Sequence, residues 1–304
     1  MKTNYLNRNR IPQLVLLLLT LFVLPACEDD VTNIRNLDVS PKLVVTSFIS
    51  PQDTFLVAKL QTSQPAIGKM LSEEQRKVKD AAVTISDGLT TVTLPYNADL
   101  NSYQTEAVNL PPVAGKTYTL KVSTPAGAKA EASCVVPAVD NIEITEINYT
   151  ATRDDEEYHH NFWRYDLSYK WIDAPGVTNY YHALAYMKYQ VEVWPNKLTM
   201  FNDIYPTLDK GNLVKDESAV NNVLQSPKFT QYGNDLGPVP RPYTLYAYLM
   251  VTEKHYYLYH RSVLEQQEVS GNPFAEPKFI YSNMAGALGA FGAYNRLEAV
   301  KEIK

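Results

Sequence analysis

The stretch KTYTLKVS, Lys116–Ser123, alternates polar and apolar residues more cleanly than any other part of the chain. Successive side chains of an extended strand point to opposite faces, so this pattern predicts a strand with one buried face. Pro125-Ala126-Gly127 follows as a turn signal, and Lys129–Val136 continues in extended form. The sequence here therefore predicts an antiparallel hairpin in a β-rich fold.

More strand candidates precede this hairpin at similar spacing. They are Lys42–Ser50, Phe55–Leu60, Ala81–Ser86 with the hairpin turn Asp87-Gly88 after it, and Thr90–Leu94. About seven short strands in about a hundred residues are typical of an immunoglobulin-like sandwich. We therefore expect residues 42–138 to form an immunoglobulin-like β-sandwich. Since the Cys and Trp pattern of antibody domains is absent, only the architecture is predicted.

The rest of the chain, residues 139–304, predicts a second β-rich domain with one helix. Its strand candidates are Ile142–Tyr149, Arg164–Trp171, Asn179–Val193 and Tyr243–Val251. Residues 195–240 are rich in Pro and Asn and are expected to be irregular. The finish, Phe279–Asn283 and Gly286–Tyr294, is expected to form a hairpin whose glycines permit tight turning.

A helix is expected at residues 253–268. Thr252 is predicted as its N-cap, and Gly271-Asn272-Pro273 ends it. The prediction rests on spacing of three to four residues, which places five side chains on one face of a helix: Tyr256, Tyr259, His260, Val263 and Leu264.

Residues 1–26 have the features of a signal peptide. Lys2, Arg8 and Arg10 form a basic region without acidic residues, and the apolar run Leu14–Leu24 follows. A helix of this run rises about 16 Å, roughly half of a bilayer core, so it is too short to span a membrane.

The apolar run ends in Leu24-Pro25-Ala26-Cys27, which resembles the bacterial lipobox. In a lipobox the cysteine is acylated and becomes the mature N-terminus, so we expect a membrane anchor at Cys27 and a tether over residues 27–41. An ordinary signal peptide with an incidental Cys27 is the alternative.

The three residues after this cysteine, Glu28, Asp29 and Asp30, form an acidic cluster. The cluster resembles the export signal that sends Bacteroidetes lipoproteins to the outer face of the outer membrane. We therefore expect the chain to be lipid-anchored in the outer membrane and to face the cell exterior. The alternative is a solvated acidic linker.

Charge and cysteine content argue against a nucleic-acid-binding protein and against a disulfide-rich one. Without residues 1–26, Lys+Arg falls from 28 to 25 against 33 Asp+Glu, a net charge of −8. No basic block remains, so nucleic acid is not expected as a partner. With Cys27 acylated, Cys134 has no partner for a disulfide and is expected to be a buried small hydrophobe.

Catalytic signatures are absent: there is no HExxH, GxSxG or P-loop motif. The acidic run Asp154–Glu157 beside His159 and His160 is the best metal candidate by content, but adjacent histidines on a strand point to opposite faces. His255 and His260 are five residues apart, which does not place them together on a helix. We predict a non-enzymatic protein with no cofactor; a surface-anchored hydrolase or metal-dependent enzyme using Asp154–His160 is the alternative.

Tyrosine is abundant, with 22 residues. Aromatic residues gather in two regions. The first contains Tyr180, Tyr181, Tyr186, Tyr189 and Trp194, and the second contains Tyr243, Tyr246, Tyr248, Tyr256, Tyr257 and Tyr259. Tyrosine offers apolar area with a polar group, which suits recognition of peptides or sugars. The alternative for each of these residues is a place in the core.

The chain resembles the Bacteroidetes family called domain of unknown function 4249. The resemblance rests on Asn272-Pro273-Phe274, Tyr281-Ser282-Asn283, the glycine-rich Gly286–Gly292 and the turn-plus-aromatic stretch Trp171–Tyr181. It implies an outer-membrane lipoprotein, often associated with TonB-dependent transporters, with no established activity and no functional residues. We therefore expect a ligand-binding accessory of such a transporter; a structural or adhesive envelope protein is a further alternative.

The anchor makes a direct prediction. Wild-type protein should incorporate a radioactive fatty acid and Cys27→Ala should not, because the thiol is the acceptor of the lipid. Equal labelling of both would contradict the lipobox. Replacing Glu28, Asp29 and Asp30 with alanine should preserve labelling but reduce protease shaving of intact cells, and unchanged shaving would show that they have no role in export.

Overall fold

The alternating stretch forms the hairpin that its pattern predicts: β7 (Thr117–Ser123) pairs antiparallel with β8 (Lys129–Val135) along its whole length. The computed structural model describes residues 40–65, 69–154, 162–193, 195–206, 211–232, 239, 242–270, 274–276 and 278–304. The mainly β class is confirmed.

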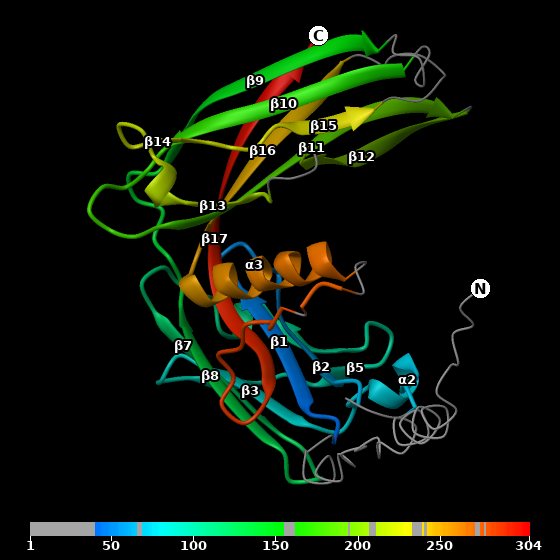
Figure 1. The fold of residues 1–304 in the computed structure, drawn as a ribbon, viewed down its shortest axis with the longest axis vertical. Helices are drawn as coiled ribbons and strands as arrows, with labels where there is room; N and C mark the ends of the chain where they lie inside the picture. The colour runs from blue at the N-terminus through cyan, green and yellow to red at the C-terminus, as the bar shows by residue number, and fades with distance from the viewer. Residues whose placement is uncertain are drawn as a thin grey trace, which may run out of the picture. The chain divides into compact units, whose positions relative to one another are not determined.

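The other elements of the described residues follow in chain order (Figure 1). They are β1 (Leu43–Ile49), β2 (Phe55–Thr62), α2 (Glu73–Arg76), β3 (Ala82–Ser86), β4 (Thr91–Thr93), β5 (Tyr96–Asn97), β6 (Ser102–Glu106), η2 (Ala107–Asn109), β9 (Glu143–Asp154), β10 (Phe162–Ile172), β11 (Tyr180–Val193), β12 (Asn196–Pro206), β13 (Leu213–Lys215), η3 (Asp216–Ser218), β14 (Val223–Gln225), β15 (Phe229–Tyr232), β16 (Tyr243–Thr252), α3 (Lys254–Val269) and β17 (Leu288–Ile303).

A first core lies between a four-stranded sheet, in the order β4-β3-β7-β8, and the β1-β2-β6-β5 end of a large sheet. Strand β1 buries every second residue, beginning with Leu43, as an alternating strand with one buried face should. The two sheets pack face to face as in a sandwich. An immunoglobulin-like arrangement remains a prediction.

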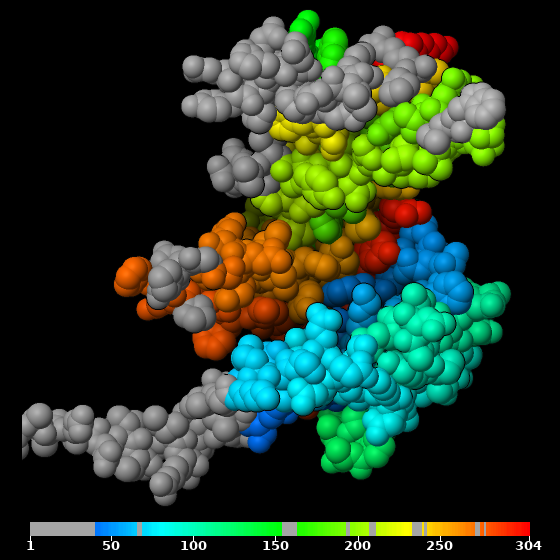
Figure 2. All heavy atoms as spheres, turned by 90° about the vertical axis from the view of Figure 1, so that its right-hand side faces the viewer, coloured from blue at the N-terminus to red at the C-terminus, as the bar shows by residue number. Residues whose placement is uncertain are grey.

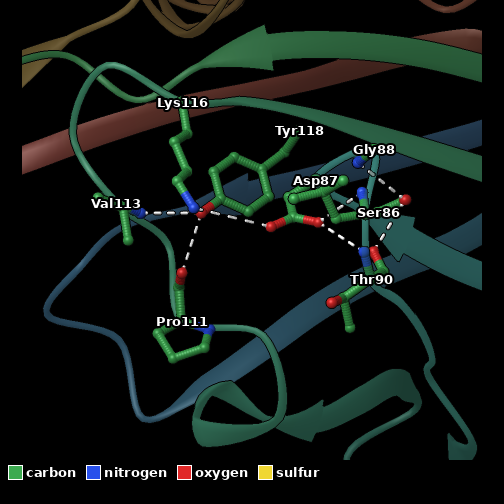
Figure 3. A network of polar contacts seen from close by, with 9 residues as sticks. Ser86, Asp87, Gly88, Thr90, Pro111, Val113, Lys116 and Tyr118 are labelled. Atoms are coloured by element: carbon green, nitrogen blue, oxygen red, sulfur yellow. Dashed lines mark hydrogen bonds and ion pairs between the residues drawn. The ribbon is translucent and has the colours of Figure 1, made fainter.

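Tyr118 ties a loop to this core (Figure 3). Its ring is only 1% exposed, and its hydroxyl donates to the Pro111 carbonyl and accepts from the Val113 N–H, both at 2.9 Å. Nearby, the Asp87 carboxylate accepts from the Thr90 N–H at 2.8 Å and so closes the β3–β4 turn. A buried hydroxyl without such partners would destabilise the fold.

A second core is filled mainly from β10, β11 and β16, with contributions from β12, β14 and β15. The large sheet joins these layers through two residue pairs between β12 and β15, Tyr205 with Thr230 and Pro206 with Phe229. The largest fully buried side chains here are aromatic: Tyr165, Tyr169, Trp171, Tyr181 and Phe229. Core packing therefore uses a large share of the aromatic residues of this half.

Strand β17 belongs to both cores. Residues 288–293 pair in parallel with β1, and residues 294–303 pair antiparallel with β16. Phe291 and Ala293 are buried in the first core, while Leu297 and Ile303 pack against the second. Most of the first core comes from residues 43–136, and the end of the chain completes it. Pro41–Lys304 therefore form one compact unit.

Gly289 allows β17 to lie against β1. Its φ is +104°, and a Cβ at this position would lie 2.0 Å from the carbonyl oxygen of Val45. Gly292 has a different role, since a Cβ there would lie 2.9 Å from the Tyr256 nitrogen of α3. Only glycine permits both close approaches.

Three local expectations were wrong. The C-terminal hairpin is absent, because residues 288–303 form one strand with partners already in place, and Gly289 and Gly292 serve close approach within that strand and not a turn. The described residues of the stretch 195–240 include regular strands: β12 pairs with β11, and β13, β14 and β15 follow, since pairing outweighs the unfavourable composition. Helix α3 is confirmed, but Glu253 caps it by accepting from the His255 N–H, and Thr252 ends β16.

Gly289→Ala should destabilise the protein by about 3–5 kcal/mol, because the added methyl group meets the Val45 carbonyl and the backbone is in a conformation that alanine disfavours. Urea denaturation measures this change. Gly88→Ala is the matched control: its φ is +90° but its surroundings are open, so a loss of about 1 kcal/mol is expected. Equal losses in the two variants would show that the β1–β17 approach is not tight.

Candidate functional site

The outer face of the sheet carries a row of aromatic side chains on β11 and β16. Tyr181, Ala183, Ala185 and Met187 point into the second core, so the residues between them point outward. Antiparallel pairing places Tyr186 directly opposite Tyr246, and Leu184 opposite Tyr248. The register of two neighbouring strands therefore brings three tyrosines together on one face.

These rings are closely packed. Tyr186 and Tyr246 are stacked with centroids 4.3 Å apart and planes 9° apart, and Tyr186 lies 4.9 Å from Tyr248. The hydroxyls of Tyr186 and Tyr248 are hydrogen-bonded at 2.9 Å. Phe201 of β12 lies 6.3 Å from Tyr186 and is 62% exposed. We call Tyr186, Phe201, Tyr246 and Tyr248 the aromatic platform.

Two cations border the aromatic platform. The Arg296 guanidinium lies 4.7 Å from the centroid of Tyr248, and the Lys188 ammonium lies 5.5 Å from that of Phe201. Both distances suit cation–π attraction. Burial and the neighbouring Tyr248 hydroxyl raise the pKa of Tyr186, so its hydroxyl stays protonated and able to donate.

An open cavity of about 600 Å³ adjoins the aromatic platform at Lys188. Its polar lining includes Gln190, Thr244 and Glu302. This size lies within the range of small-molecule sites, and its lining offers an amide, a hydroxyl, an ammonium and a carboxylate.

Helix α3 covers the neighbouring part of the same face (Figure 1). Beneath it, the His182 and His260 rings lie 5.8 Å apart, and His182 Nδ1 is 2.8 Å from the Tyr256 hydroxyl. Burial lowers the pKa of both histidines to about 4, so they are neutral at pH 7. His260 Nε2 is buried and has no hydrogen-bond partner among the described residues.

A second polar group lies at the start of α3. Glu253 Oε1 is 3.5 Å from His255 Nε2, and His255 Nδ1 is 2.6 Å from the Tyr281 hydroxyl. Burial raises the pKa of Glu253 to about 7 and lowers that of His255. Burial also raises the pKa of Tyr281, so its hydroxyl is not activated as a nucleophile.

The residues predicted from sequence lie in different places. Cys27, Glu28, Asp29 and Asp30 lie outside the described residues, as do Asp155–His160 of the metal candidate, while the backbone of Asp154 ends β9. Cys134 is buried at 3% exposure, as expected, and burial raises the pKa of its thiol.

In the part of the chain that the structure describes, no three His, Cys, Asp or Glu side chains are grouped as a metal ion would require. Of the helices described there, none has the length and apolar character needed to cross a membrane.

Sequence reasoning missed two groupings. His182 and His260 come from β11 and α3, and sequence gives no sign that these elements meet. The aromatic platform had a visible signal, because Tyr186, Tyr246 and Tyr248 lie at outward positions of two strands with clean alternation. What the sequence lacked was the register that makes them neighbours.

Comparisons with known proteins give a family and distant structures. The family model described as "Domain of unknown function (DUF4249)" matches residues 28–299. No curated protein matches the chain. Among solved structures, "Biofilm associated protein - BSP domain" shares 9% identity at TM-score 0.18 and "Biofilm associated protein - B domain" 7% at 0.17. Each match covers 84% of this chain, with 58% of the first and 85% of the second structure.

The buried histidines predict acid sensitivity. The unfolded state binds protons near pH 6.5 and the folded state only near pH 4, so stability is full above pH 6.5 and falls as pH drops through this window. The loss should be on the order of 1–3 kcal/mol per histidine by pH 4. His260→Phe should flatten this dependence in urea titrations between pH 7 and 4. An unchanged slope in this variant would contradict the role of His260.

Glu253 gives the opposite trend and serves as a control. Its raised pKa makes the folded state hold a proton between pH 4.5 and 7, so its contribution to stability is lost as pH rises from 4.5 to 7 and opposes that of the histidines in this window. Glu253→Gln should therefore make the rise of stability between pH 4.5 and 7 steeper in the same urea titrations, and an unchanged slope would contradict the raised pKa of Glu253.

Proposed function

The chain belongs to the DUF4249 family, and we propose that it is a non-enzymatic, lipid-anchored binding protein of the outer membrane that faces the cell exterior. In this proposal it captures a ligand and passes it to a TonB-dependent nutrient transporter. The ligand-binding part is the aromatic platform with its adjoining cavity.

The anchor is supported by the lipobox at Cys27 and by the basic and apolar segments before it. The acidic residues Glu28, Asp29 and Asp30 support exposure at the cell surface. Two acyl chains bind a bilayer far more firmly than one, so an acylated Cys27 would hold the protein at the membrane.

The observation that carries a binding role is the aromatic platform. Three tyrosines in mutual ring contact, with Tyr186 and Tyr246 stacked, and the largely exposed Phe201 lie on a sheet face beside a cavity of about 600 Å³. An aromatic group of this kind on a solvent-facing surface is typical of recognition sites. It is held on paired strands, which keep its geometry fixed.

A non-enzymatic role is supported by the chemistry of the polar groups. The Glu253–His255–Tyr281 group has the order of an acid, a base and a hydroxyl, but the raised pKa of Tyr281 makes its oxygen a poor nucleophile. Its donor and acceptor bonds instead fix the start of α3. The transporter partnership rests on the family resemblance alone.

The test is affinity purification of the tagged protein from its native membrane in mild detergent, followed by mass spectrometry. A TonB-dependent transporter should be recovered reproducibly with the wild type. Cys27→Ala is the control, since a protein without its anchor should recover much less transporter. Abundant lipoprotein without any transporter would contradict the proposal.

The alternatives give other results. An enzyme would show an activity that a chelator or changes at His159 and His160 remove. An adhesive envelope protein would recover no transporter, and its deletion would alter attachment of cells to surfaces.

A further inference from the structure

The three tyrosines of the aromatic platform lie on strands that are paired on both sides. Strand β11 pairs with β12 and β13 on one side and with β16 on the other, and β16 pairs with β17. A peptide that binds by adding a strand needs a free edge, which β11 and β16 do not offer beside these tyrosines, whereas β12, which carries Phe201, pairs on its far side with β15 only at Tyr205 and Pro206 among the described residues. A ligand that lies on the tyrosine rings is therefore recognised by side chains.

The side chains around the aromatic platform include both donors and acceptors. Residues directly opposite in paired strands share a face, which places Asp203 beside Tyr186 and Glu298 beside Tyr248. With Glu192 and Glu302 of the cavity they give four carboxylates against Lys188, Lys197 and Arg296, so formal charges of −4 and +3 nearly cancel. A strongly charged ligand gains little on such a face.

The aromatic groups form a continuous apolar area. Phe201, at one side of the row, is 62% exposed, and Val300, opposite Tyr246 at the other side, is 50% exposed. The stacked rings between them are fixed by mutual packing and by the hydroxyl contact of Tyr186 with Tyr248. Little side-chain entropy is therefore lost when a ligand lies on this surface.

We propose that the aromatic platform and its cavity bind a neutral oligosaccharide. A sugar ring has C–H faces that pack on aromatic rings and hydroxyls that both donate and accept hydrogen bonds. The aromatic rings supply the surface on which the C–H faces pack. The hydrogen-bond partners of the sugar hydroxyls are the side chains of Lys188, Arg296, Glu298 and Glu302. This inference rests on the proposed binding function and names its ligand class.

The cavity extends the site beyond one sugar ring. It shares Lys188 with the aromatic platform and adds Gln190, Thr244 and Glu302. Amide, hydroxyl and carboxylate groups match the hydroxyls of a second residue of the chain. A short oligosaccharide should accordingly bind more tightly than its monosaccharide.

The test uses the acylated, tagged protein on an array of neutral, sialylated and sulfated oligosaccharides, followed by calorimetry with the best neutral one. Binding to neutral oligosaccharides is expected. Tyr246→Ala and Phe201→Ala should each weaken the affinity at least tenfold. Phe279→Ala, which removes a 97% exposed ring outside the aromatic platform, should leave the affinity unchanged. Unchanged thermal unfolding of the variants shows that their folds are intact.

Three results would overturn the inference. The protein could retain only charged glycans, or both platform variants could bind the neutral glycan as tightly as the wild type. The third is a protein that binds no glycan and captures peptides from a random library. Transporter recovery is measured separately with Tyr246→Ala. If the transporter is recovered with this variant and the wild type binds no neutral glycan, the sugar inference fails and the accessory function stands. If the wild type binds neutral glycans and recovers no transporter, the accessory function fails and the sugar inference stands.

Discussion

The close approach of β17 to β1 at Gly289 is the contact on which the rest of the structure depends. A Cβ there would meet the Val45 carbonyl at 2.0 Å, so the parallel pairing of residues 288–293 needs glycine. The same strand then pairs antiparallel with β16. Because one strand runs through both pairings, the first core is completed by the end of the chain, and the second gains Leu297 and Ile303.

This strand also sets where α3 lies. Gly292 lets the Tyr256 backbone approach β17, and Tyr256 then packs on Phe48 of β1 at 5.0 Å and bonds to His182 of β11. The helix therefore covers the part of the outer face around His182 and leaves the part around Tyr186 and Tyr246 uncovered. In Figure 2 the light-green surface of residues near 195–215 lies directly above the orange surface of α3.

Alternation and helical spacing were enough to predict β7, β8, β11, β16 and α3, because these signals are local. Partners were not predictable, since alternation gives a strand its buried face and says nothing of its neighbour. The pairing of Val45 with Gly289 joins residues far apart in sequence, and the glycines were therefore interpreted as a turn. The same limit hid the contact of His182 with His260 and the register that makes Tyr186 and Tyr246 neighbours.

Equilibrium unfolding in urea, followed by one probe in each core, tests most directly whether β17 couples the two cores. Trp171 is fully buried in the second core, and its fluorescence reports that core. With Cys27 replaced by alanine, Cys134 is the only thiol, and its labelling rate reports the first core. Because β17 runs through both cores, coincident midpoints are expected for the two probes. Two separate midpoints, with one core unfolding while the other stays intact, would contradict this expectation.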